Sequence, residues 1–138
     1  FEIKDGLKIN VLKTFALDRI YNCEVTTEFI LKDTIDVQNH FKDFMGVTTK
    51  PLDGFSEKTT VKIETSIEYG KYFSTLPIHQ SQKTEIENGK TIISLQVIPT
   101  MELVSEILSH NHQIKVIEPK ELVNIVKKTI SQNLKQYN

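Results

Sequence analysis

The sequence predicts an α+β fold in which residues 59–117 form a four-stranded antiparallel sheet covered by two helices. Hydrophobic periodicity in this stretch follows the order strand, helix, strand, strand, helix, strand. Asn88-Gly89, at its centre, is the pair that favours a tight type I′ hairpin. Strand-helix-strand crossovers are right-handed in nearly all cases, so both helices lie on one face of the sheet. The pattern therefore predicts a ferredoxin-like βαββαβ sandwich, with its core between helices and sheet.

The first strand and helix are predicted from residues 59–77. Residues 59–65 are rich in β-branched side chains and place Val61 and Ile63 on one face, which is typical of a half-buried strand. Ser66 is expected to cap the next helix, and Pro77 to end it. The apolar stripe expected on this helix consists of Tyr69, Tyr72, Phe73 and Leu76.

The second half repeats this order after the hairpin. Residues 84–87 and 91–98 are predicted strands, Thr100 is the expected cap of the second helix, and residues 113–117 form the last strand. The apolar stripe of the second helix is Met101, Val104, Ile107 and Leu108. The open face of the sheet is expected to meet solvent or a polar partner, because its residues are Lys62, Glu64, Ser94, Gln96 and Lys115, interrupted by Ile92, Ile98 and Ile117.

The first 30 residues read as strands without a helix. Residues 1–3 and 9–17 are strand-like around an Asp5-Gly6 turn, and residues 19–26 continue the alternation. Two or three strands over about 26 residues cannot enclose a core of their own. We therefore expect them to be the last strands of an incomplete small β-barrel, in a chain cut from a longer protein.

A short helix and a linker are predicted between the strands and the sandwich. Asp33 or Thr34 is the expected cap, and Gly46 the expected C-terminal stop. The face of this helix is formed by Val37, Phe41, Phe44 and Met45. Residues 47–57 have no periodicity and are interpreted as the linker. The predicted division is thus 1–30 barrel strands, 31–57 linker helix and loop, and 58–138 sandwich with a terminal helix.

The C-terminal helix is predicted to begin with Pro119 in its first turn and to run for about 18 residues. Its apolar stripe is Leu122, Val126, Ile130 and Leu134. Such a stripe lies across the sandwich or reaches a neighbouring subunit, and both alternatives stay open. The second alternative predicts a homodimer.

Composition limits the function classes. Lys and Arg number 17 against 18 Asp and Glu, so the net charge of −1 supplies no general field for phosphate backbone or an anionic membrane. The single cysteine, Cys23, excludes an internal disulfide framework and fits the reducing cytoplasm. No apolar run approaches the roughly 20 residues that span a bilayer, and no signal-peptide pattern opens the chain.

Four short motifs, in order, resemble the C-terminal half of bacterial WYL-domain transcriptional regulators. They are residues 15–20 (FALDRI), 44–47 (FMGV), 76–82 (LPIHQSQ) and 116–122 (VIEPKEL). The resemblance implies a winged helix-turn-helix for DNA, a small sensing barrel, and a ferredoxin-like extension. The chain departs from the family pattern because it has no tryptophan and no helix-turn-helix pattern, so DNA binding is expected to lie outside these residues.

Arg19 and the loop after Pro77 are the candidate effector-binding residues. A guanidinium matches a phosphate or carboxylate with two parallel hydrogen bonds, and the resemblance implies that the arginine of the FALDRI motif contacts an anionic or nucleic-acid effector. The alternative is a local pair between Arg19 and Asp18. The loop residues form a polar cluster in which a binding surface is often built, or a solvated loop: His79, Gln80, Ser81 and Gln82.

No residue pattern predicts catalysis, a cofactor or a metal site. His110 and His112 lack a third ligand nearby, while Cys23 and His40 are isolated. No nucleophile motif or glycine-rich phosphate loop is present. Two classes remain: a non-enzymatic sensing and dimerisation portion of a regulator, or a free-standing ferredoxin-like domain that binds a ligand or RNA. The RNA class is disfavoured because lysine, glutamate, serine and glutamine stand where stacking aromatics are needed.

Overall fold

The computed structural model describes the chain except for residues 1, 5–6, 10–15, 26, 28–35 and 138. It consists of two compact units, Phe1–Thr34 and Ile35–Asn138. Among the described helices, none is long and apolar enough to cross a membrane. The larger unit contains the predicted sandwich.

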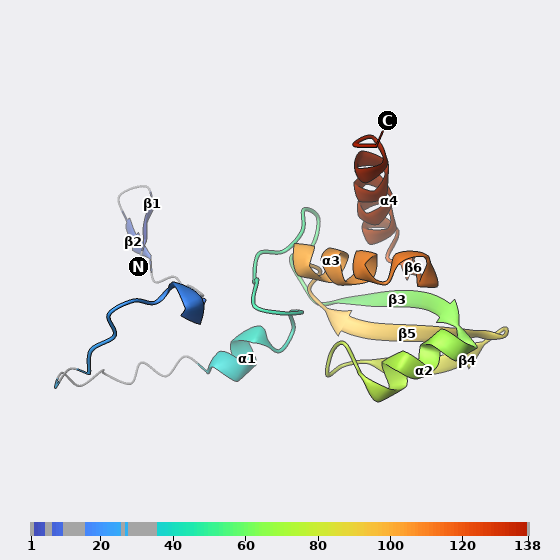
Figure 1. Cartoon of the computed structure of the whole chain (residues 1–138), viewed down its shortest axis with the longest axis horizontal. Helices are drawn as coiled ribbons and strands as arrows, with labels where there is room; N and C mark the ends of the chain where they lie inside the picture. Colours follow the sequence, from blue (N-terminus) through green and yellow to red (C-terminus); the bar gives the residue numbers. More distant parts are fainter. Residues whose placement is uncertain (1, 5–6, 10–15, 26, 28–35, 138) are drawn as a thin grey trace. The chain divides into compact units, whose positions relative to one another are not determined.

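The sandwich has the predicted topology (Figure 1). Its four strands pair in the order β4-β5-β3-β6, and every neighbouring pair is antiparallel. The first and last strands therefore belong to one sheet, as the sequence predicted. The elements are β3 (Thr59–Ser66), α2 (Ile67–Thr75), β4 (Lys83–Glu87), β5 (Lys90–Val97), α3 (Met101–Ser109), a 3₁₀ turn (Asn111–Gln113) and β6 (Ile114–Glu118).

The predicted start and turn signals act as expected at two of three positions. The Ser66 hydroxyl accepts a hydrogen bond of 3.1 Å from the Tyr69 amide and so caps α2. Asn88 and Gly89 both have positive φ, 50° and 75°, as a type I′ turn requires. Thr100 precedes α3 but its hydroxyl does not cap it; that oxygen is buried without a polar partner in the described part of the chain.

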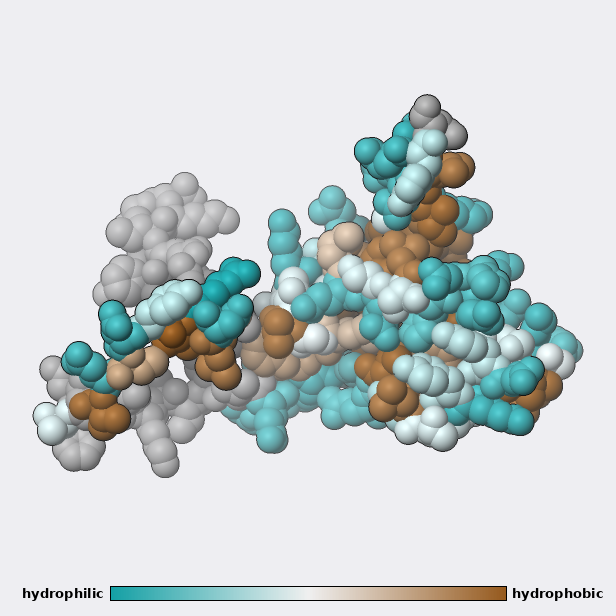
Figure 2. Space-filling view, in the orientation of Figure 1, coloured by the Kyte–Doolittle hydropathy of each residue, from teal (hydrophilic) through white to brown (hydrophobic). Residues whose placement is uncertain are grey.

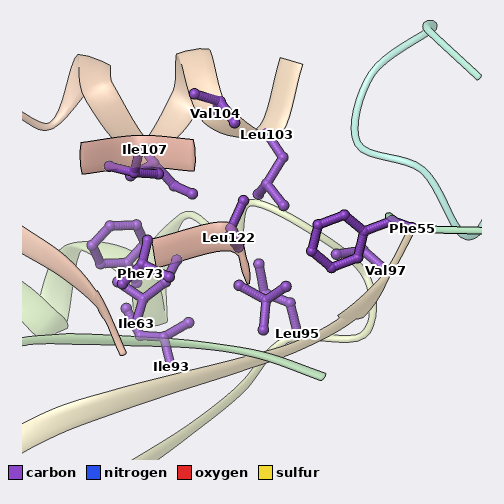
Figure 3. Close-up of a cluster of buried hydrophobic side chains, with 13 residues drawn as sticks. Phe55, Ile63, Phe73, Ile93, Leu95, Val97, Leu103, Val104, Ile107 and Leu122 are labelled. Carbon is purple, nitrogen blue, oxygen red and sulfur yellow. The ribbon is translucent and has the colours of Figure 1, made fainter. Parts of the chain in front are cut away.

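The core lies between the helices and one face of the sheet (Figure 3). Sheet residues from the predicted inner face contribute Val61, Ile63, Ile93, Leu95, Val97 and Val116. The helical contribution differs from the prediction. Phe73, Val104 and Ile107 are buried, but Met101 of the predicted stripe is 52% exposed and Leu103 is buried in its place. Leu76 is also exposed, because it is the C-cap residue of α2 and lies beyond the last turn.

The opposite face of the sheet is largely polar. Lys62 and Glu118 pair across β3 and β6 at 3.2 Å. Ile92, predicted near an end of this face, is only 7% exposed. It lies on the central strand β5, and its cross-strand neighbours are Glu64 of β3 and Glu85 of β4. A longer side chain therefore stands on each side of Ile92 and covers it.

The helix before the sandwich, α1 (Val37–Phe41), is shorter than predicted. The predicted caps Asp33 and Thr34 lie outside the described residues, and the observed cap is Asp36, whose carboxylate accepts from the Asn39 amide at 3.0 Å. The predicted stop at Gly46 is wrong, because the helix ends at Phe41. Gly46 nevertheless has a φ of +78°, which favours glycine at a sharp bend.

The predicted linker is packed on the sandwich. The Ile98 amide donates to the Asp43 carbonyl at 2.7 Å, and the Leu52 amide donates to the Pro99 carbonyl at 2.9 Å. Phe55, within the segment, is 8% exposed and belongs to the core. We refer to residues 36–58 as the docked segment, since backbone bonds and a buried ring fix them to β5 and α3.

The C-terminal helix, α4 (Lys120–Leu134), projects away from the sandwich (Figure 1). Pro119 is its N-cap and not a residue of its first turn. The predicted stripe divides in two: Leu122 and Val126 are buried, whereas Ile130 and Leu134 are 51% and 61% exposed. Half of the stripe thus stabilises the domain and half faces solvent.

The smaller unit contains an antiparallel hairpin, but the strand predicted at residues 9–17 is wrong in its described part: only residue 9 belongs to a strand, residues 16–17 do not, and residues 10–15 lie outside the described residues. β1 (Glu2–Lys4) and β2 (Leu7–Ile9) pair antiparallel. Leu17–Arg19 is a 3₁₀ turn, and residues 20–25 are not a strand, so the prediction for residues 19–26 is wrong in its described part. An alternating pattern becomes a strand only where a neighbour accepts its backbone hydrogen bonds, and no described residue pairs with this stretch.

Candidate effector-binding site

Arg19 lies in the smaller unit, at the end of the 3₁₀ turn. Its side chain is exposed, and its amide donates to the Ala16 carbonyl at 3.1 Å. The local alternative, a salt bridge to Asp18, is not among the ion pairs of the described residues. The effector role predicted for Arg19 stays a prediction.

His79, in the larger unit, joins its own loop to the docked segment. Its Nε2 lies 3.0 Å from the Lys42 carbonyl oxygen, and the Ser81 amide donates to its Nδ1 at 3.1 Å. A carbonyl oxygen only accepts, so the hydrogen is assigned to Nε2 and the lone pair to Nδ1. Both ring nitrogens of His79 are therefore engaged, one with the docked segment and one with its own loop.

Gln80 binds the same carbonyl oxygen as His79. Its side-chain amide donates to the Lys42 carbonyl at 2.8 Å. The exposed Gln80 side chain also lines an open hollow of about 540 Å³. The remaining residues around this hollow come from the docked segment: Asp36, Gln38, Asn39, Phe41 and Lys42. Amide, carboxylate and ammonium groups beside one aromatic ring suit a small polar ligand.

Gln82 has a structural role that the sequence did not reveal. Its Nε2 donates to the Phe73 carbonyl at 2.7 Å, and its Oε1 accepts from the Ile78 amide at 3.1 Å. The first bond satisfies a carbonyl in the last turn of α2. Gln82 therefore fixes the loop to the end of α2, and its polar atoms point inward. Its role is structural, whereas Gln80 lines the hollow.

Ser81 belongs to the polar cluster predicted from the sequence, but its bonds and those of the Lys42 carbonyl were not predicted. The Ser81 hydroxyl accepts from the Gln96 amide at 2.8 Å and lies 2.7 Å from His79 Nδ1. It thereby fixes the loop to the end of β5. The sequence alone does not identify such bonds, because every residue has a backbone carbonyl group that can accept them.

The structure brings three of the four predicted effector residues together. His79, Gln80 and Gln82 lie in one loop of the larger unit, whereas Arg19 lies in the smaller unit. Among the described residues, no group of three His, Cys, Asp or Glu side chains is placed to hold a metal ion.

Comparison with known proteins decides the family. Residues 57–134 match the sequence model of the WCX domain. The chain belongs to the WCX-domain family. WCX domains are associated with WYL-type transcriptional regulators, so the resemblance drawn from the four motifs is confirmed. No curated protein matches the chain.

The WCX match includes every element of the sandwich and all of α4. His79, Gln80 and Gln82 lie within the WCX domain, and Arg19 precedes it. The residues that bind the Lys42 carbonyl therefore belong to the WCX domain, while Lys42 itself belongs to the docked segment before it.

Proposed function

We propose that this chain is the non-enzymatic sensing and dimerisation portion of a bacterial transcriptional regulator that acts in the cytoplasm. The DNA-binding winged helix-turn-helix of that regulator lies outside these 138 residues. The WCX match supports the regulatory context. The observation that carries the dimerisation role is the exposed half of the α4 stripe.

The exposed part of α4 is suited to self-association. Ile130, Leu134 and Tyr137 are 51%, 61% and 87% exposed. Figure 2 shows hydrophobic residues running up one side of this projecting helix. A two-fold interface presents the same surface from both partners, and two antiparallel helices meet this condition. Burying about 400 Å² of apolar area contributes roughly 10 kcal/mol before the entropic costs of association are subtracted.

The dimerisation role is tested by sedimentation velocity across protein concentration. The unmodified chain is expected to form a dimer that dissociates on dilution, and Ile130→Glu is expected to sediment as a monomer throughout. Ser131→Glu, which adds the same charge at the neighbouring exposed position, is the matched control and is expected to dimerise. A monomer at every concentration would leave α4 as a structural brace.

The effector is proposed to be anionic or a nucleic acid. Arg19 and the loop of His79, Gln80 and Gln82 are proposed as two separate contacts, and within the loop Gln80 is the residue that meets the ligand, because Gln82 bonds the end of α2. Gln80 supports this proposal best, because it lines the hollow beside α1 and its side-chain amide has a second hydrogen that is uncommitted among the described hydrogen bonds and can be donated to an anion. The test is thermal shift with small phosphates, carboxylates and a short single-stranded oligonucleotide. Arg19→Ala and Gln80→Ala are compared, and loss of the shift in either variant identifies that residue as a contact.

The alternative is a free-standing ferredoxin-like domain that binds a ligand or RNA. An RNA-binding sheet needs aromatic side chains on its exposed face, and the central strands present Lys62, Glu64 and Ser94 there. The sequence upstream in the same reading frame separates the two classes. A winged helix and a Trp-Tyr-Leu motif are expected there, and a reading frame that contains neither supports the alternative.

A further inference from the structure

An apolar groove lies where α3, β6 and α4 meet, on a different part of the domain from the loop of His79. Its volume is about 190 Å³. Its floor is formed by buried residues of all three elements, Ile107 of α3, Val116 of β6 and Val126 of α4. The floor of the groove is therefore built into the sandwich, and the exposed Ile130 of α4 also lines the groove.

The polar residues around the groove are Asn111, Lys115 and Lys127. The two lysines are positively charged, and no carboxylate residue lines the groove. Both lysines are exposed, and neither takes part in an ion pair within the described part of the chain. An apolar hollow with lysines at its border favours a ligand that has an apolar body and a negative head.

The size of the groove limits the ligand. An apolar cavity of about 150 Å³ holds benzene, whereas drug-sized ligands occupy pockets of roughly 300–1,000 Å³. The groove thus accommodates one aromatic ring or a short alkyl chain. It is too small for a helix of a second copy, because one helical turn with side chains occupies about 400 Å³.

We propose that this groove binds small apolar carboxylates, with the ring or alkyl chain between Val126 and Ile107 and the carboxylate beside Lys127. This site is separate from the effector residues proposed above and does not rest on the regulatory function. Binding at this position bridges α4 to α3 and β6, and so stabilises the attachment of the projecting helix.

The test compares three ligands of equal chain length, hexanoate, hexanol and hexylammonium, by amide chemical-shift mapping of the intact chain. Hexanoate is expected to bind most tightly, with saturable shifts at Leu108, Ile114 and Val123, which also line the groove. Hexanol is expected to bind more weakly, and hexylammonium weakest, because the apolar contacts are shared and only the head group differs.

Two charge-reversal variants separate the local contact from general charge. Lys127→Glu is expected to weaken hexanoate about five- to tenfold and to leave hexanol within about twofold. Lys128→Glu changes the net charge equally at the neighbouring exposed position, outside the groove, and should leave both affinities unchanged. Val123→Phe fills the groove and should abolish binding of both ligands, with a retained dispersed spectrum as proof of folding.

Three outcomes would overturn the proposal. They are the absence of saturable shifts at the groove, equal affinity for hexanoate and hexylammonium, and equal effects of Lys127→Glu and Lys128→Glu. Because Ile130 lines the groove and also belongs to the proposed dimer surface, the titrations are made at a protein concentration at which sedimentation shows a monomer. Sedimentation of the unmodified chain without ligand tests the dimerisation proposal separately, because it reports self-association and not hexanoate binding.

Discussion

Gly70 of α2 lies directly against Thr91 of β5. A Cβ atom placed on Gly70 would stand 2.6 Å from the Thr91 Cβ, a separation that real side chains do not adopt. Both residues are buried, and Thr91 is only 3% exposed. The helix therefore approaches the sheet at this point as closely as its backbone allows, and Phe73, one turn further on, enters the core.

Gly70→Ala is expected to lower the free energy of unfolding by up to about 2 kcal/mol. Overpacking a buried contact costs about 1–3 kcal/mol, and alanine in a helix regains about 1 kcal/mol of this. Urea unfolding followed by circular dichroism measures the change. Lys71→Ala, at the next, exposed position of α2, is the control and should stay within about 0.5 kcal/mol. A raised midpoint for Gly70→Ala would show that the contact is not tight.

Tyr69→Phe is expected to destabilise the sandwich by about 0.5–1.5 kcal/mol. The Tyr69 hydroxyl lies 2.9 Å from Nδ1 of His110, which is 8% exposed, and His110 Nε2 lies 3.2 Å from Glu106. Removing the hydroxyl leaves Nδ1 of the buried His110 ring without its hydrogen-bond partner, because this ring lies between Tyr69 of α2 and Glu106 of α3. Thermal and urea unfolding both report this change.

The matched control for that variant is Tyr72→Phe. Tyr72 also packs near His110, with ring centroids 6.0 Å apart, but its hydroxyl makes no hydrogen bond among those of the described residues, and the side chain is 46% exposed. Its loss should change stability by less than about 0.5 kcal/mol. Equal effects of the two substitutions would argue against the hydrogen bond as the cause.

Gln82→Ala should lower stability by about 1–2 kcal/mol, because the side chain bonds both the Phe73 carbonyl and the Ile78 amide. Gln80→Ala should change stability by less than about 0.5 kcal/mol, since the Lys42 carbonyl keeps its bond to His79. Chemical denaturation of both variants distinguishes a structural glutamine from one available to a ligand. The reverse order would contradict this assignment.

The chain is expected not to retard generic double-stranded DNA or RNA at physiological salt. Affinity for phosphate backbone scales with the cations placed against it, and here 17 basic residues are offset by 18 acidic ones. Gel retardation at 150 mM salt, a condition near physiological ionic strength, checks this. Retardation at micromolar or lower chain concentration would contradict it.

The sandwich was predictable because each of its elements carries a local signal. Ser66 marks the start of α2 and Asn88-Gly89 marks the hairpin, and both act through atoms within three residues along the chain. The alternation of Ile93, Leu95 and Val97 fixed the inner face of β5 in the same way.

The errors arose where distant contacts decide the structure. Phe55 looked like part of a linker because its core neighbours come from remote elements. Ile92 looked exposed because its burial depends on flanking strands. The stretch after Arg19 has a strand-like pattern without a partner strand among the described residues. For the candidate site, the sequence located the loop of residues 79–82, but could not show that Gln82 faces inward.

The docked segment is not a free linker between residue 36 and the sandwich. About 20 extended residues would reach roughly 70 Å. The segment does not extend in this way, because the Asp43 carbonyl accepts from the Ile98 amide and the Pro99 carbonyl accepts from the Leu52 amide. A force applied at Asp36 is therefore transmitted to β5 and to the start of α3 without first extending a flexible linker.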